Sequence, residues 1–143
     1  MKNLTPERGC FYLERWVFTL FGFSIRLHHW LKDDDQRYFH DHPFHMLIII
    51  LKGSYTDISP IEYKTGAQKG QMYGKSLDFL RAGSVRFRKA THKHSVVIDN
   101  DGCWSLLFTS PIVRHWGFWI PGRDRLLRPL RYFERYGHHQ CEK

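Results

Sequence analysis

Two histidine pairs, each with one residue between its members, are the part of this sequence best suited to chemistry. His40 and His42 form the first pair, His92 and His94 form the second, and each pair precedes an apolar segment. Residues two apart in an extended strand point to the same face, so both members of a pair can reach one ion. Imidazole nitrogens are good ligands for transition metals. The pattern predicts a metal site; the alternative is that these are loop-end histidines with no shared role.

The residues that follow the first pair resemble the first motif of the cupin superfamily, G(x)5HxH(x)3-4E(x)6G. His40-x-His42 is followed by Met46 at the position of the motif's glutamate and then, after six more residues, by Gly53 at its closing glycine. Met46 is a departure from the motif, because a thioether is a poor ligand for a hard or borderline cation.

The second pair lies in a segment that is similar to the second cupin motif, G(x)5PxG(x)2H(x)3N. Gly83 and His94 occupy the positions of the first glycine and the histidine of that motif. Lys89 and Thr91 replace its proline and second glycine, so we expect the turn to differ from that of the family. Ile98 stands at the asparagine position.

The resemblance implies a double-stranded β-helix barrel that holds a divalent transition metal, namely iron, zinc, manganese or nickel. It implies His40, His42 and His94 as the ligands, and three-histidine sites without the glutamate occur among cupins, as in the thiol dioxygenases. Such a site leaves coordination positions open for substrate and oxygen. The implied function is a metal-dependent enzyme, an oxygenase or an isomerase. Residues 116–119, Trp-Gly-Phe-Trp, add a similarity to small stand-alone cupins of bacteria and phages.

His92 is the candidate catalytic residue. It shares a strand face with His94, so it could be a ligand, a general base or a residue at the barrel mouth. We expect it beside the metal ligands rather than among them. His45 is offset by an odd number of residues from His42 and is expected to be structural.

The charge balance indicates either an anionic partner or simply a solvated basic surface. The chain has 22 Lys and Arg against 14 Asp and Glu, a net charge of +8, which favours a nucleotide, a sugar phosphate or a carboxylate as the small-molecule ligand. The substrate-binding candidates are two arginines and two aromatic residues: Arg86, Arg88, Tyr38 and Trp104. Arginine binds phosphate and carboxylate through paired hydrogen bonds. The alternatives are a ligand-binding cupin without catalysis and, less favoured, a basic nucleic-acid-associated protein, because one fold hosts many activities.

Short apolar segments separated by turn residues predict an all-β fold, a cupin-like jelly-roll barrel with short flanking helices. The predicted strands are 23–28, 46–52, 54–58, 77–80, 84–88, 92–98, 103–109 and 113–120. Gly53 marks one predicted turn, and residues 99–102, Asp-Asn-Asp-Gly, mark a predicted hairpin. The polar, glycine-rich residues 61–75 are expected to connect two strands.

The length of 143 residues predicts a single domain. We divide it into an N-terminal extension, 1–22, the barrel, 23–121, and a basic tail, 122–143. Leucines of the tail recur at helical spacing, so we expect a short helix there.

The sequence also predicts a cytoplasmic protein. No apolar run approaches the ~20 residues that cross a bilayer, so we expect no membrane partner. Glu7, Arg8, Glu14 and Arg15 interrupt any signal-peptide core. The three cysteines form neither a zinc pattern nor a disulfide framework, which is typical of a reducing compartment. The resemblance to cupins also implies a homodimer, because cupins often pair through strand exchange or sheet packing.

Overall fold

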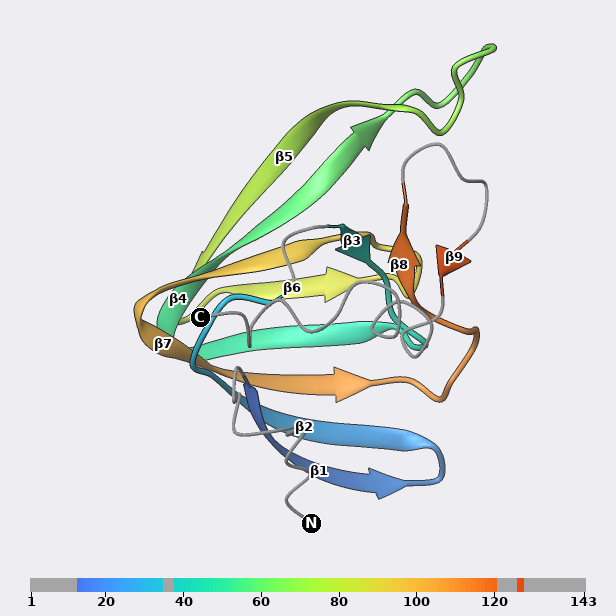
Figure 1. The fold of residues 1–143 in the computed structure, drawn as a ribbon. Helices are drawn as coiled ribbons and strands as arrows, with labels where there is room; N and C mark the ends of the chain where they lie inside the picture. Colours follow the sequence, from blue (N-terminus) through green and yellow to red (C-terminus); the bar gives the residue numbers. More distant parts are fainter. Residues whose placement is uncertain (1–12, 35–37, 121–125, 128–143) are drawn as a thin grey trace.

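The computed structural model describes residues 13–34, 38–120 and 126–127, and these residues form antiparallel sheets (Figure 1). The larger sheet has the strand order β1-β2-β7-β4-β5, and β6 also pairs with β4. Its strands are β1 (Leu13–Leu20), β2 (Phe23–Trp30), β4 (Met46–Glu62), β5 (Met72–Arg81), β6 (Val85–Arg88) and β7 (Ser95–Thr109). The smaller sheet consists of β3 (Phe39–His40), β8 (Phe118–Trp119) and β9 (Leu126–Leu127). The predicted all-β class is confirmed.

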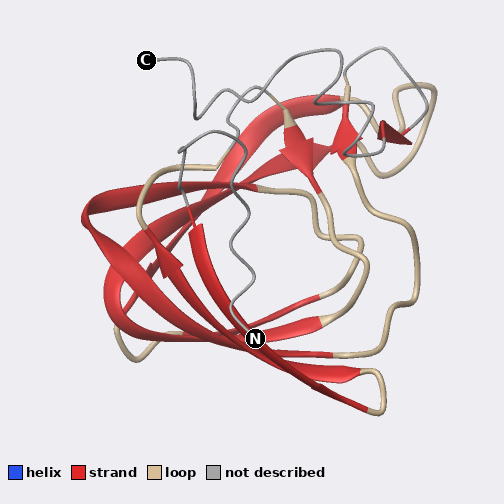
Figure 2. Ribbon diagram, turned by 60° about the horizontal axis from the view of Figure 1, so that its bottom comes forward, coloured by secondary structure: helices blue, strands red, loops and turns tan. Residues whose placement is uncertain are grey.

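The strands of the larger sheet curve around a common interior (Figure 2), and side-chain alternation decides what fills it. Met46, Ile48 and Ile50 are buried on one face of β4, whereas Leu47 on the other face is exposed. This period of two is what a half-buried strand requires. The interior cluster consists of Phe44, Met46, Ile48, Ile50, Tyr55, Leu80, Val96, Cys103 and Leu107.

Two glycines that suggested turns lie instead inside long strands. β4 continues through Gly53 and β7 continues through residues 99–102, so both predicted hairpins are wrong. Gly53 and Gly102 each have a φ of 77°, and a Cβ on Gly53 would lie 2.2 Å from the carbonyl oxygen of Gly102. The β4–β7 register shifts on either side of Gly53. The glycines therefore allow two paired strands to bend together. A bend of this kind uses glycine just as a turn does, so the two cannot be told apart by residue type.

The connection predicted at 61–75 is shorter than expected, since β4 ends at Glu62 and β5 begins at Met72. Residues 13–20 of the predicted N-terminal extension form β1, an edge strand that pairs with β2. The helix predicted for the tail lies mostly outside the described residues. The two described residues of the tail, Leu126 and Leu127, form β9 instead.

None of the described residues belongs to a helix, so this part of the chain has no helix of the length and apolarity needed to cross a membrane.

Candidate metal centre

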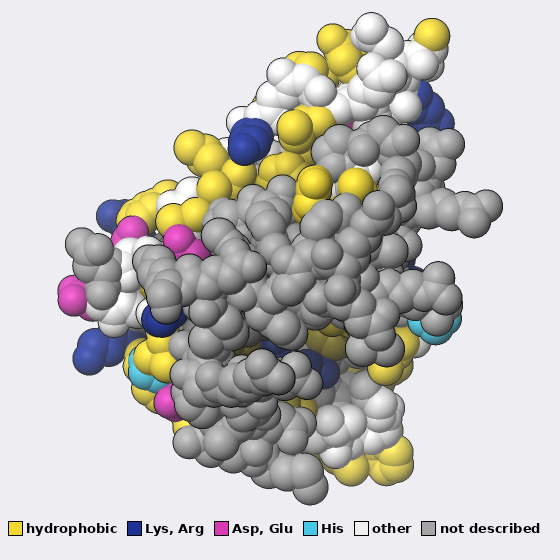
Figure 3. All heavy atoms as spheres, viewed as in Figure 1, with side chains coloured by type: hydrophobic (Ala, Val, Ile, Leu, Met, Phe, Trp, Pro, Cys, Tyr) yellow, Lys and Arg dark blue, Asp and Glu magenta, His cyan; other side chains and the backbone are white. Residues whose placement is uncertain are grey.

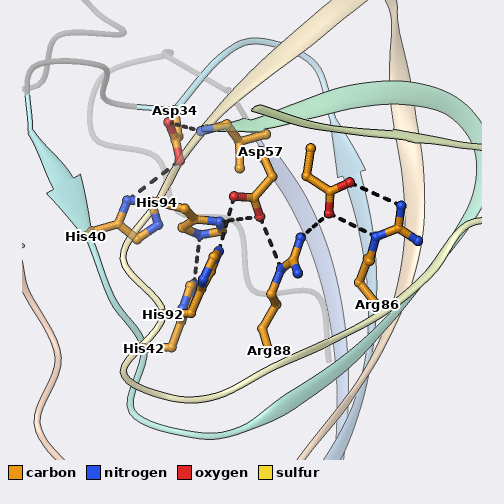
Figure 4. Close-up of polar contacts among 10 residues, drawn as sticks. Asp34, His40, His42, Asp57, Arg86, Arg88, His92 and His94 are labelled. Atoms are coloured by element: carbon orange, nitrogen blue, oxygen red, sulfur yellow. Dashed lines mark hydrogen bonds and ion pairs between the residues drawn. The ribbon is translucent and has the colours of Figure 1, made fainter. Parts of the chain in front are cut away.

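Backbone pairing brings the two histidine pairs together. The amide of His40 donates to the carbonyl of His94 at 3.0 Å, and the amide of His94 donates to the carbonyl of His40 at 2.9 Å. The amide of His42 donates to the carbonyl of Ala90 at 3.1 Å. The start of β7 is therefore held against the segment that carries the first pair, and the three rings of His40, His42 and His94 converge (Figure 4).

The three rings are spaced as ligands of one ion would be. Each offers a nitrogen within 4.8 Å of the others, and the Nε2 atoms of His42 and His94 are 3.2 Å apart. Two nitrogens that each lie about 2.0–2.1 Å from one ion are separated by roughly 3 Å. The ring centroids of His40 and His42 both lie 4.7 Å from that of His94.

The protonation state of these rings also suits a cation. Burial, reinforced by the neighbouring His94, lowers the pKa of His40 and of His42 well below the usual value of 6.5. Both rings are therefore neutral at physiological pH, and a neutral imidazole is the form that binds metal. Nδ1 of His42 is buried and has no hydrogen-bond partner in the described part of the chain. The nitrogen of His42 that faces His94 is Nε2, so the fit to an ion rests on the two Nε2 atoms, which lie 3.2 Å apart. The residues present thus fit a transition metal.

Asp57 of β4 lies between the histidines and Arg88 (Figure 4). It is 1% exposed, its Oδ2 lies 2.9 Å from His94 Nδ1, and its Oδ1 lies 3.2 Å from His92 Nε2. Burial alone would raise the pKa of Asp57, but the charge of His94 and hydrogen bonds from His92 and His94 lower it well below its usual range. Asp57 is therefore a carboxylate that fixes the orientation of both rings.

Asp57, His92 and His94 form a second group that could hold an ion. Arg88 Nε lies 3.5 Å from Asp57 Oδ2, and a guanidinium at that distance already supplies the positive charge that the carboxylate needs. The three-histidine group is therefore the better metal site, with Asp57 behind it. A carboxylate that hydrogen-bonds the outer nitrogen of a ligating histidine is the usual arrangement at metal centres.

Asp41 anchors the first pair from the residue between its two histidines. Its carboxylate is fully buried and accepts hydrogen bonds from the guanidinium of Arg114, from the amide of Gly117 at 3.1 Å and from Trp119 Nε1 at 3.0 Å. The Trp-Gly-Phe-Trp segment therefore fixes the position of the backbone that carries His40 and His42. Sequence reasoning did not single out Asp41 or Asp57.

Met46, at the glutamate position of the cupin motif, is 3% exposed and packs in the interior cluster with Phe44 and Ile48. His45 accepts a hydrogen bond on Nδ1 from the amide of Ala90 at 2.9 Å, in line with the structural role expected for it.

The two predicted substrate arginines already have carboxylate partners. Arg86 makes two hydrogen bonds to Asp78, at 2.9 and 3.1 Å, and Arg88 Nη2 donates to the same carboxylate. Arg88 also faces Asp57 and so belongs to the histidine site, whereas Arg86 stands one step further out (Figure 4).

The two predicted aromatic contacts are less favourably placed. Trp104 lies on the opposite face of β7 from the buried Cys103, where it stacks on His29 with ring centroids 4.0 Å apart. The alternation of β7 thus turns Trp104 away from the interior. Tyr38 packs against Phe118 and Ile120, the small cluster beside the histidines.

Comparison with known proteins agrees with this architecture. No family model and no curated protein sequence matches the chain. Among solved structures, Fe(II) HppE superposes with a TM-score of 0.56 at 8% identity, covering 76% of this chain and 55% of HppE. Co(II) HppE in complex with substrate superposes at 0.51 with 10% identity, covering 68% and 52%. A protein of unknown function from Rhizobium leguminosarum bv. viciae 3841 gives 0.52 at 12% identity, covering 73% and 86%.

These similarities define a class of fold. The chain is an all-β protein with a cupin-like jelly-roll architecture, and it spans about half the length of HppE. At identities this low the shared feature is the fold, and the chemistry depends on the residues described above.

Proposed function

We propose that this protein is a metal-dependent enzyme, an oxygenase or an isomerase, in which His40, His42 and His94 hold a divalent transition ion. The observation that carries the proposal is the convergence of three rings, two of them with Nε2 atoms 3.2 Å apart, backed by a buried carboxylate. That structures of HppE hold Fe(II) or Co(II) in the same fold supports it. Such an ion acts as a Lewis acid with positions open to substrate.

The side chains around the ligands have separate roles in this proposal. Asp57 orients His94 and keeps its Nδ1 engaged at 2.9 Å, so Nε2 faces the ion. His92 is bound to the same carboxylate through Nε2, which leaves its Nδ1 to exchange a proton with substrate. Asp41 holds the backbone of His40 and His42 through its bonds to Gly117 and Trp119.

The substrate in this proposal is a small anion, such as a nucleotide, a sugar phosphate or a carboxylate. The net charge of +8 favours anions over cations at the surface. Arg88 faces Asp57, the carboxylate that contacts His94, and an incoming anion would compete with Asp78 for its guanidinium. A thermal-shift screen of anionic and neutral compounds at two salt concentrations tests this part. Stabilisation by neutral compounds only would overturn it.

Metal analysis of purified protein tests the site itself. We expect about one transition ion per chain in the wild type and a sharp loss in H40A, H42A and H94A, because each variant removes one of three ligands. H115A is the matched control, since His115 is exposed and outside the group. Unchanged stoichiometry in all three ligand variants would refute the assignment. Turnover in air compared with argon then separates an oxygenase from an isomerase, and a metal-loaded protein without turnover would be a binding protein.

A further inference from the structure

Two loops at one end of the larger sheet bring exposed apolar side chains together (Figure 1). The turn between β1 and β2 lies beside the segment that follows β7, since a Cβ added to Gly22 would be 3.2 Å from the Cβ of Pro111. Six apolar side chains at this end are between 54% and 89% exposed: Phe18, Leu20, Phe21, Phe23, Ile112 and Val113. We call these six residues the apolar tip.

The apolar tip is larger than an ordinary patch of exposed hydrophobic surface. At about 200 Å² for a fully exposed side chain of this size, its six members present roughly 800 Å². The largest apolar patch on a typical monomer is about 300–600 Å². Hydrophobic side chains are visible at the surface over the turn between β1 and β2 in Figure 3. Apolar surface of this extent marks a place where the protein contacts another molecule or a membrane.

Phe21 shows that the side chain at the apex of the turn is there for a purpose other than folding. Phe21 and Gly22 form the two-residue turn between β1 and β2, and Phe21 has a φ of 49°. This left-handed conformation is unfavourable for a bulky residue, and asparagine or glycine is the usual choice in such a turn. Because the ring is 89% exposed, no burial within the described part of the chain offsets the strain.

The rim next to the apolar tip carries an exposed cation. Met46 of β4 pairs with Arg88 of β6 on one side and with Thr109 of β7 on the other. Lys89, the residue after β6, therefore lies at the end of the sheet where β7 leads into the apolar tip, and its side chain is exposed.

The exposed carboxylates lie at the opposite end of the sheet. Among the described residues, the exposed acidic side chains are those of Asp99 and Asp101. Both belong to the part of β7 beyond Cys103, whereas the apolar tip adjoins the other end of that strand, at Thr109. The tip end of the described chain thus presents apolar groups and a cation, with no exposed carboxylate beside them.

We propose that the apolar tip inserts into the headgroup region of a bilayer that contains anionic phospholipid. Binding of this kind grows with the apolar area that is buried and with the attraction of cations to anionic lipid. Aromatic rings are favoured at the boundary between headgroups and acyl chains. The net charge of +8 attracts the chain to such a surface, and the end of the sheet that makes contact has no exposed carboxylate among its described residues to oppose this.

A bilayer suits the shape of the tip. Its most exposed member, Phe21, stands at the apex of a turn, and fluid lipid closes around a projecting side chain without a complementary pocket. The sequence-based expectation of no membrane partner rested on the lack of a spanning segment, and binding at the surface needs none. The proposal goes beyond the metal site and does not depend on it.

The experiment is co-sedimentation of the full chain with vesicles of phosphatidylcholine, alone or mixed with phosphatidylserine in equal parts. We expect the chain to sediment with the mixed vesicles, and more salt to weaken this binding. F21N should lower the partition coefficient about tenfold or more, because it removes a buried aromatic ring. Asparagine accepts a positive φ, so this variant should fold, and thermal unfolding checks that it does. L77N is the matched control, since Leu77 is 67% exposed on β5, outside the tip.

A second pair of variants tests the orientation of the bound protein. K89E and K52E change the net charge equally, but Lys89 lies beside the tip and Lys52 lies at the bend, next to Gly53. We expect K89E to weaken binding to the mixed vesicles more than K52E does, because only the first places a carboxylate against the lipid.

Three results would overturn the proposal. The wild type could stay in the supernatant with both kinds of vesicle, in which case the tip contacts a protein or is covered by other residues of the chain. Folded F21N could sediment as well as the wild type, or K89E and K52E could weaken binding equally, and then the attraction would come from net charge alone. Metal content is measured in parallel and is expected to be unchanged in F21N, so a failure of the membrane proposal and a failure of the metal site are distinguishable.

Discussion

Replacing Asp57 with asparagine tests whether the buried carboxylate controls metal affinity through His94. The carboxylate of Asp57 receives His94 Nδ1 at 2.9 Å, His92 Nε2 at 3.2 Å and Arg88 Nε at 3.5 Å. Asparagine has the same shape but one acceptor oxygen, so at least one of these donors would face its NH2 group. His94 would then lose the partner that fixes its ring.

Loss of the hydrogen-bond partner of a ligating histidine lowers metal affinity by about 10–100-fold, which corresponds to about 1.4–2.7 kcal/mol of binding free energy. We expect D57N to fall in this range in a competition titration of Zn²⁺ or Co²⁺ against a chelator at neutral pH. The matched control is D78N, because Asp78 also pairs with Arg88 but touches none of the three ligands. Urea unfolding of both variants confirms that the comparison is made between folded proteins.

Equal metal affinity in D57N and wild type would refute the reasoning, because it would mean that His94 needs no partner to bind. Equal weakening in D57N and D78N would also count against it. In that case the effect would pass through Arg88 rather than through the hydrogen bond to His94.

Three further predictions concern stability. D41A should lower the free energy of unfolding by about 3–5 kcal/mol, because it leaves Arg114 without the buried carboxylate it contacts; urea unfolding with an unchanged midpoint would contradict this. Metal-free protein should lose thermal stability as the pH falls below about 6.5, because the unfolded chain binds protons at three histidines that stay neutral in the folded protein. A melting temperature that is constant down to pH 5 would argue against it. Those histidines, whose pKa burial lowers, are His28, His40 and His42. G53A should destabilise the fold by more than the ~1–3 kcal/mol of a left-handed non-glycine residue, because its Cβ would clash with the Gly102 carbonyl. G66A is the control: nothing lies within 4 Å of its added Cβ, so in the same thermal assay it should lose only the backbone contribution.

The sequence could identify the histidines because their signal is local. Two residues of one type, spaced by two before an apolar segment, reveal a shared face without knowledge of the partner strand. The three rings of His40, His42 and His94 do come together. Their role as metal ligands stays a prediction until metal content is measured.

The carboxylates could not be identified in the same way, because their significance depends on pairing. Asp57 lies beyond the bend at Gly53, where the β4–β7 register shifts. The alternation of side chains that starts at Met46 therefore does not predict the face of β4 on which Asp57 lies. The role of Asp41 depends on its hydrogen bonds from Gly117 and Trp119. These residues are distant in the sequence, so the sequence alone does not reveal the contacts. The turns predicted at Gly53 and at residues 99–102 were wrong for a related reason. A glycine with positive φ ends a strand in one context and bends it in another.

The pairing of distant histidines has a consequence for how the chain folds. His42 and His94 are separated by 52 residues, and closing a loop of that length has an entropic cost before any contact compensates for it. The ligand set is therefore complete only after His40 and His94 have paired across that loop, and we expect this non-local pairing to form late in folding. An ion held by these rings would act as a cross-link formed after the rate-limiting step. It would prolong the lifetime of the folded protein by slowing its unfolding, and it would leave the speed of folding nearly unchanged.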